Sequence, residues 1–181
     1  KLKRIDTNVE NCRVAFARAG KAVTIEPAQI DSTQCTRQDT IKLASLSTAK
    51  LNEEETRCAI AARLFMWEHN VVQPAARQHL GEPVAEILHF GSYSCRTIRG
   101  SSWRMSEHST ANAFDISGFR LSSGKLVSLK QQWQGSQPEA EFLKKVRDGA
   151  CDYFNVVLSP DYNADHHDHL HVDMGWYRTC R

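Results

Sequence analysis

The sequence has no apolar run long enough to cross a membrane. The best candidate, Cys58 to Trp67, is interrupted by Arg63, whereas a spanning helix needs roughly 18–20 apolar residues. It also has no nucleotide-binding glycine loop, because neither GxxxxGK(S/T) nor GxGxxG occurs. These absences argue against a transmembrane segment in this chain and against a P-loop or Rossmann-type nucleotide enzyme.

A strong excess of charge of one sign is also missing. The net charge is +2, and lysine and arginine are scattered among acidic residues along all 181 positions. A protein that neutralises many phosphates shows a much larger basic excess. We therefore expect no nucleic-acid partner.

The six cysteines contain no CxxC pair, which zinc ribbons and fingers require. An even, dispersed set favours disulfides and an oxidising compartment, so we expect a periplasmic or secreted protein. The alternative is six buried thiols in a cytosolic protein. Because six cysteines allow about 15 connectivities, the pairing stays open. The chain opens on Lys-Leu-Lys-Arg with no apolar stretch behind it, so the leader or anchor of an exported protein is expected to be absent from this sequence.

Residues 1–50 are predicted to form a mixed, turn-rich segment tied by disulfides, with a short strand at Ala22–Ile25. Asn52 and Glu55 resemble a capping box, and the apolar residues that follow recur at helical spacing. This predicts a helix from about Glu53 to His69. A second helical stretch, interrupted at Pro74, is expected to end at Gly81.

The second half alternates strands with one helix. Strands are predicted over 84–93, 113–121, 126–129, 155–158 and 170–174, with a hairpin turn at Gly124–Lys125 and a helix from Pro138 to about Asp152. Helices first and antiparallel strands afterwards indicate an α+β fold, with helices packed on one central, mainly antiparallel sheet. No repeat, low-complexity tract or linker divides the chain, so one domain over 1–181 is expected.

Four of the eight histidines lie within the six residues 166–171. If 170–174 is a strand, Leu170 and Val172 point to the core, while His169 and His171 point to the opposite face and line a cleft. This geometry suits one imidazole bound to a metal and a second imidazole beside it.

A second motif strengthens this interpretation. The stretch Ser106-Glu-His-Ser-Thr-Ala-Asn-Ala-Phe-Asp115 places His108 in a loop and Asp115 at the start of a strand. Asp115 then faces the cleft, since its two neighbours face the core. The small residues Ala111 and Ala113 let the backbone turn tightly around a bound ion.

The pattern SxHxx(G/A)xAxD followed far downstream by HxH resembles the LAS metallopeptidases, which include lysostaphin, D-alanyl-D-alanine metallopeptidases, murein endopeptidases and the hedgehog domain. Within that group the stretch from Gly91 to His171 is most similar to the bacterial extensin-like C-terminal domain family. The resemblance covers residues from about 55 to 181. The family glycine is replaced by Ala111, which should be tolerated unless the backbone there needs a positive φ.

The resemblance implies Zn²⁺ bound by His108, Asp115 and His171, with His169 as the unligated catalytic base. Two imidazoles and one carboxylate suit zinc and leave a fourth position for water. Arg96 resembles the arginine that such peptidases place near the substrate. Three further residues are candidates for orienting the ligands or contacting substrate: His166, Asp168 and Ser106.

The expected function is a zinc-dependent peptidoglycan hydrolase that acts on stem peptides or cross-links, foremost as a D,D-endopeptidase. The alternatives are a D-alanyl-D-alanine carboxypeptidase and a non-catalytic, zinc-containing cell-wall-binding module, which would need no base at His169. The cluster could also be a structural or adventitious metal site. His166 and His167 could be solvated loop residues, and Arg96 could be a structural ion-pair partner. The oligomeric state is left open.

Overall fold

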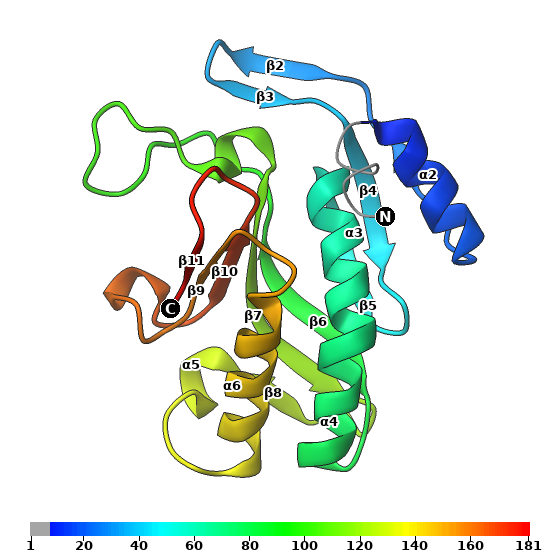
Figure 1. Cartoon of the computed structure of the whole chain (residues 1–181), viewed down its shortest axis with the longest axis vertical. Coiled ribbons are helices and arrows are strands. Elements are labelled where there is room, and N and C mark those ends of the chain that lie inside the picture. Colours follow the sequence, from blue (N-terminus) through cyan, green and yellow to red (C-terminus); the bar gives the residue numbers. More distant parts are fainter. Residues whose placement is uncertain (1–7) are drawn as a thin grey trace.

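The computed structural model describes residues 8–181, within which nine strands form one large sheet (Figure 1). The order is β1-β4-β5-β6-β7-β10-β9-β11, and β8 also pairs with β7. All neighbours are antiparallel except β5–β6 and β9–β11. The predicted α+β class with a mainly antiparallel sheet is confirmed. The strands are β1 Thr24–Ile25, β4 Thr40–Ser45, β5 Lys50–Arg57, β6 Val84–Gly91, β7 Ala113–Leu121, β8 Leu126–Ser128, β9 Val156–Leu158, β10 Leu170–Asp173 and β11 Thr179–Cys180.

The longer helices pack against the sheet around a shared apolar core. Figure 1 shows α3, α4 and α6 on one side of the strands. Phe119 of β7 lies between Trp67 and Phe142, at ring distances of 6.2 and 5.1 Å. None of the helices among residues 8–181 is long and apolar enough to span a bilayer. The helices are α2 Val9–Arg18, α3 Cys58–Trp67, π-helix η1 Glu68–Val72, α4 Gln73–Leu80, α5 Leu129–Gln132 and α6 Pro138–Ala150, with 3-10 turns η2 Glu107–Thr110 and η3 Ala164–His166.

The strands that carry the candidate site were predicted well. The range 113–121 of β7 is confirmed, and β10 ends one residue before the predicted end at Met174. The β7–β8 turn contains Gly124 at φ +90°, where only glycine is unstrained. The predicted helix at 138–152 is α6, which ends at Ala150.

The predicted helix start near Glu53 is wrong. Residues 50–57 form strand β5, which pairs with β4 and β6. The acidic residues bind other segments: Glu55 accepts from Arg37 at 3.0 Å, and Glu54 accepts from the Ser92 N–H at 2.8 Å. Tertiary pairing therefore outweighs the local capping signal, and α3 begins only at Cys58.

The interruption expected near Pro74 is a change of helix type. The π-helical turn η1 joins α3 to α4, and Pro74 lies in the first turn of α4, where a missing N–H is tolerated. Glu68 of η1 is fully buried and accepts from the N–H groups of Ser47 and Ala49 at 3.0 and 3.1 Å. It thereby fastens the β4–β5 turn to the helix.

The N-terminal segment is more regular than predicted, because it contains α2, β4 and a separate hairpin of β2 Gln29–Ser32 and β3 Cys35–Arg37. Its first seven residues lie outside the described range. The disulfide prediction is confirmed, since all six cysteines are paired. Two of the three bonds, Cys12–Cys58 and Cys35–Cys95, tie this segment to the rest of the chain. The third, Cys151–Cys180, lies near the other end of the chain.

Candidate metal centre

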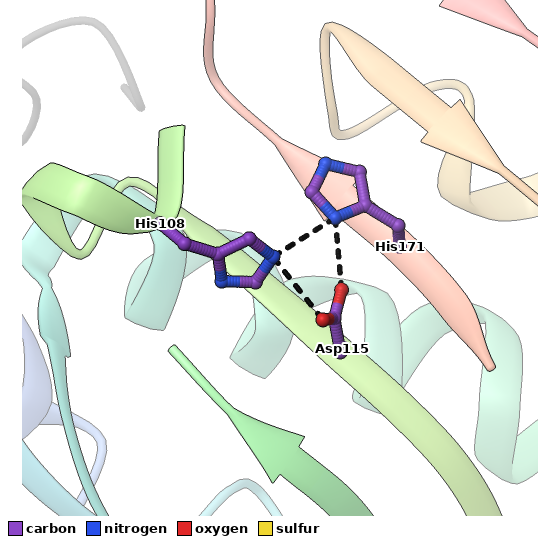
Figure 2. A group of neighbouring side chains, drawn as sticks. All are labelled: His108, Asp115 and His171. Carbon is purple, nitrogen blue, oxygen red and sulfur yellow. Dashed lines mark hydrogen bonds and ion pairs between the residues drawn. The ribbon is translucent and has the colours of Figure 1, made fainter. Parts of the chain in front are cut away.

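Three elements bring His108, Asp115 and His171 together (Figure 2). Turn η2 carries His108, while Asp115 of β7 and His171 of β10 are direct partners in the antiparallel register. One ligand atom from each residue lies within 4.8 Å of the other two. The three residues, called here the metal cluster, could therefore hold one metal ion.

Strand alternation explains why these side chains share a face. On β7, Phe114 and Ile116 are fully buried in the core, so Asp115 points to the opposite side. On β10, Leu170 and Val172 are buried in the same core, so His171 points toward Asp115. This is the arrangement that the two motifs predicted.

The ring of His108 is oriented by a hydrogen bond on the side away from the metal cluster. Its Nδ1 lies 2.8 Å from the Ser92 carbonyl oxygen, which can only accept, so Nδ1 carries the proton. Its Nε2 then points into the cluster, 3.2 Å from Asp115 Oδ2, where it can bind a metal ion or, when protonated, donate to the carboxylate. Ser106 caps η2 by accepting the His108 N–H at 3.3 Å, which fixes the turn that carries the ring.

The ring of His171 is oriented in the same way by Asp173. His171 Nε2 lies 3.0 Å from Asp173 Oδ2, and its Nδ1 lies 2.8 Å from Asp115 Oδ1. The inner nitrogens of the two rings, Nε2 of His108 and Nδ1 of His171, are only 3.1 Å apart. Two lone pairs at this distance repel each other unless a proton or a metal ion lies between them. The donor set thus fits a cation bound by two imidazoles and a carboxylate.

Without a metal, protons take the place of the cation. Burial lowers the pKa of the His171 imidazole, but hydrogen bonds to Asp115 and Asp173 outweigh it and raise the pKa to about 9. Burial likewise raises the pKa of Asp115, but the hydrogen bonds from His108 and His171 hold it well below its usual range. Asp115 is therefore an anionic carboxylate that attracts a cation, either a protonated imidazole or a metal ion.

His169 lies beside the cluster without being part of it. Its Nδ1 is 2.9 Å from Asp168 Oδ1, which turns Nε2 toward Asp115 Oδ1 at 3.7 Å. The His166 ring lies 5.1 Å from that of His169 and 5.9 Å from that of His171. Burial, followed by the nearby charges of His171 and His169, lowers the pKa of His166 to about 4, so it is neutral at neutral pH.

The comparison with protein families covers the part of the chain that carries the metal cluster. A family described as extensin-like protein C-terminus matches residues 10–181. The chain belongs to the extensin-like C-terminal family. The match includes every residue of the metal cluster and all six cysteines. No curated protein and no solved structure gives a significant match.

One predicted site residue is not drawn into the cluster of this extensin-like domain. Arg96 is exposed, and within residues 8–181 no hydrogen bond or ion pair joins its guanidinium to the metal cluster. Only its backbone carbonyl takes part locally, by accepting the Ser106 N–H at 3.1 Å. A contact between Arg96 and substrate stays a prediction.

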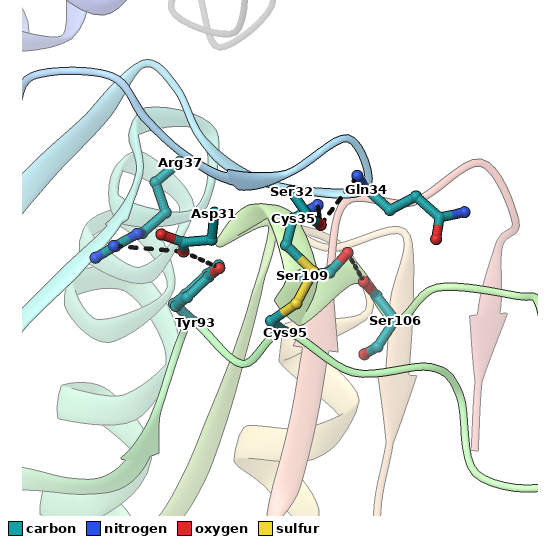
Figure 3. The surroundings of a disulfide bond; sticks show 9 residues. All are labelled: Asp31, Ser32, Gln34, Cys35, Arg37, Tyr93, Cys95, Ser106 and Ser109. Carbon is teal, nitrogen blue, oxygen red and sulfur yellow. Dashed lines mark hydrogen bonds and ion pairs between the residues drawn. A yellow bond between two sulfur atoms is a disulfide. The ribbon is translucent and has the colours of Figure 1, made fainter.

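Two supporting residues were not predicted. Asp173 continues the two-residue spacing of His169 and His171 to the end of β10, so the sequence HLHVD carried a usable signal. Ser92 acts through its backbone carbonyl, which no side-chain motif reveals. The segment that contains Ser92 is fixed by the β2–β3 hairpin (Figure 3), through the Cys35–Cys95 disulfide and a hydrogen bond from Tyr93 to Asp31.

Proposed function

We propose that this chain is a zinc-dependent peptidoglycan hydrolase that cleaves peptide bonds in stem peptides or cross-links, foremost as a D,D-endopeptidase. The observation that carries the proposal is the convergence of the donor atoms of His108, Asp115 and His171, with His169 beside them. The likeness of the two motifs to the LAS metallopeptidases supports the choice of reaction.

Zinc is the metal that fits this donor set best. Two neutral imidazoles and one carboxylate form a common catalytic zinc site with one position left for water or substrate. Zinc supplies Lewis acidity, which polarises the scissile carbonyl and makes a water molecule more acidic. The partners of the outer ring nitrogens, Ser92 and Asp173, favour the tautomers that such a metal needs.

His169 would perform the proton transfers. Asp168 accepts the Nδ1 proton of His169, so Nε2 can accept a proton from water. The water oxygen bonds to the carbonyl carbon, the carbon–nitrogen bond breaks, and the same proton passes from Nε2 to the leaving amine. The Asp168–His169 pair favours an enzyme over a binding module, which needs no oriented base.

We further propose that the protein works in the periplasm or outside the cell. The three disulfides fit such an oxidising compartment. Peptidoglycan is accessible there, so the location and the proposed substrate agree.

Incubation of the zinc-loaded protein with muropeptide monomers and cross-linked dimers tests the proposal, with product masses as the readout. Conversion of dimers to monomers supports the endopeptidase. Loss of a terminal D-alanine from monomers instead identifies the carboxypeptidase. Stoichiometric zinc with no cleavage of either substrate would overturn the catalytic proposal and favour a binding module. Chelation should abolish any activity, and zinc should restore it.

A further inference from the structure

The large sheet is split beside the metal cluster, on one side of β7. Strand β10 pairs with residues 113–116 of β7, and β8 pairs with residues 118–120. Because β6 pairs along the other edge of β7, β8 and β10 share one edge and leave Ser117 between them. The side chain of Ser117 lines the space between these two strands.

A groove with a cavity volume of about 260 Å³ opens at this split. We call it the β8 groove. Its apolar lining comes from β6 and β8 and consists of Leu88, Phe90 and Leu126. Its polar lining consists of Ser117, Ser128, Lys130 and Asp168.

The β8 groove is continuous with the candidate site. Asp168 lines the groove and also orients His169 at 2.9 Å. Phe90 lies at the same junction, since its ring is 5.9 Å from the ring of His169. Phe90 is nevertheless 62% exposed, so its face is available to a ligand. A chain bound with one bond at the metal cluster can extend directly into this groove.

The lining of the groove contains one acidic and one basic side chain, Asp168 and Lys130. The carboxylate of Asp168 is already paired with His169, which lies beside Asp115. The side chain of Lys130, at the start of α5, belongs to the groove, and within residues 8–181 no carboxylate forms an ion pair with it. Because Asp168 is paired with His169 and Lys130 has no such partner in the described range, Lys130 is the side chain of this lining that attracts an anionic group on a ligand.

We propose that the β8 groove is a substrate subsite for the arm of a stem peptide that carries a free carboxylate. The apolar side chain of this arm rests on Phe90 and Leu126, and its carboxylate pairs with Lys130. This inference rests on the proposed function. It adds that Lys130 and Leu126 determine substrate specificity, and that peptides with a free carboxylate are preferred over their amides.

Kinetics on the zinc-loaded full chain test the role of Lys130. Lys130→Gln should raise KM for a free-acid muropeptide roughly tenfold, since a charge-assisted hydrogen bond of this size is lost, and should leave kcat and the amidated substrate unchanged. Lys130→Arg should restore KM, and Leu126→Ser should raise KM for both substrates. Lys145→Gln, on the exposed side of α6, is the matched control and should change nothing. Equal KM values for acid and amide in the wild type would overturn the proposal while leaving the hydrolase activity in place.

Binding is measured separately from catalysis by NMR titration of the isotope-labelled full chain with the free-acid peptide in the presence of chelator. Shifts at Leu88, Ser117 and Leu126 that weaken in Lys130→Gln support the subsite, even if the loaded protein cleaves nothing. Shifts confined to other surfaces would overturn it, even if the loaded protein cleaves normally. The two readouts thus distinguish failure of the subsite from failure of the proposed function.

Discussion

The carboxylate of Asp173 lies 3.0 Å from Nε2 of His171, on the opposite edge of the ring from Asp115. This contact fixes the tautomer that directs the Nδ1 lone pair into the metal cluster. Asp173→Ala should therefore weaken zinc binding by about 10–100-fold, the usual effect of removing such a partner. Zinc dissociation constants from competition with a chelating dye provide the measurement.

The Asp173 variant needs a control because the same carboxylate also accepts the Gly175 N–H at 2.7 Å. Asp173→Asn keeps an acceptor oxygen and should retain more affinity than alanine. Asp148→Ala, which removes an exposed aspartate on α6, should bind zinc like the wild type. If Asp173→Ala also keeps full affinity, the orientation argument is wrong.

The two histidines of the HxH motif should respond differently to truncation. His171→Ala removes a ligand, so zinc binding and hydrolysis should fall together. His169→Ala should leave zinc nearly stoichiometric but reduce the rate by roughly 10²–10⁴-fold, the usual contribution of a positioned general base. Elemental analysis combined with muropeptide kinetics separates the two effects. Loss of metal in His169→Ala with retention in His171→Ala would reverse the assignment.

Zinc uptake should release about one proton from the metal cluster at neutral pH, because a metal ligand must be deprotonated. In the metal-free protein the pKa of His171 is raised to about 9, above its ordinary value of 6.5, so the ring is protonated at pH 7.5. A raised folded-state pKa stabilises the metal-free fold below pH 6.5, and this stabilisation is lost as the pH rises through 9. Zinc affinity should accordingly increase over the same interval.

Calorimetry of zinc binding in buffers with different ionisation enthalpies counts the released protons. The wild type should give a value near one between pH 7 and 8, and the value should fall toward zero above pH 9 as His171 loses its proton in advance. Zinc binding to Asp173→Asn should release fewer protons, because a neutral amide stabilises the His171 imidazolium more weakly than a carboxylate does. No proton release at pH 7.5 would contradict the charge state assigned to His171.

The strands of the second half could be predicted because their signals are local. In β7 and β10, buried apolar residues alternate with residues on the opposite face of the sheet, and Asp115 and His171 lie on that opposite face. Glycine at the β7–β8 turn and Pro138 at the start of α6 mark element boundaries directly. The pairing of Asp115 with His171 followed once these two strands were adjacent.

The first half depends on long-range contacts that a local pattern does not contain. Glu54 and Glu55 read as the first turn of a helix, yet they bind Ser92 and Arg37 from strand β5. The β2–β3 hairpin is attached through a disulfide to Cys95, sixty residues away in the sequence. The contribution of Ser92 to the metal cluster is equally hidden, because it is made by the backbone.

The Cys35–Cys95 disulfide should support metal binding as well as stability. It holds the segment whose Ser92 carbonyl orients His108 and whose Ser94 N–H donates to the His108 carbonyl at 3.0 Å. The double variant Cys35→Ser/Cys95→Ser should lose about 2–4 kcal/mol of unfolding free energy and should bind zinc more weakly. Denaturant unfolding and zinc competition provide the two measurements.

Cys151→Ser/Cys180→Ser is the matched control, because this disulfide joins the end of α6 to β11, and neither element carries His108 or Ser92. It should reduce stability to a similar extent while leaving zinc affinity unchanged. If both double variants lose zinc equally, the effect reflects general loosening of the fold. Intact mass after alkylation without reductant should show no free thiol in the wild type.

Ala111 has a left-handed backbone, with φ +52°, a conformation that favours glycine. It ends turn η2, which carries His108, and its carbonyl accepts the Arg57 N–H at 3.0 Å. A positive φ strains alanine but not glycine, so Ala111 should lower the free energy of unfolding by about 1–2 kcal/mol relative to glycine. Ala111→Gly removes this strain but adds unfolded-state entropy and loses a buried methyl group, so stability should change by less than about 1 kcal/mol.

Ala111→Val should behave very differently. A β-branched side chain at positive φ is strongly disfavoured, and the site is fully buried, so the methyl groups must displace neighbours. We expect a loss of at least about 2 kcal/mol from these two effects, together with weaker zinc binding, since η2 cannot move without moving His108. Thermal unfolding and zinc competition of both variants, in parallel with wild type, decide the matter. A valine variant as stable as wild type, with unchanged zinc affinity, would show that the left-handed turn does not determine the position of His108.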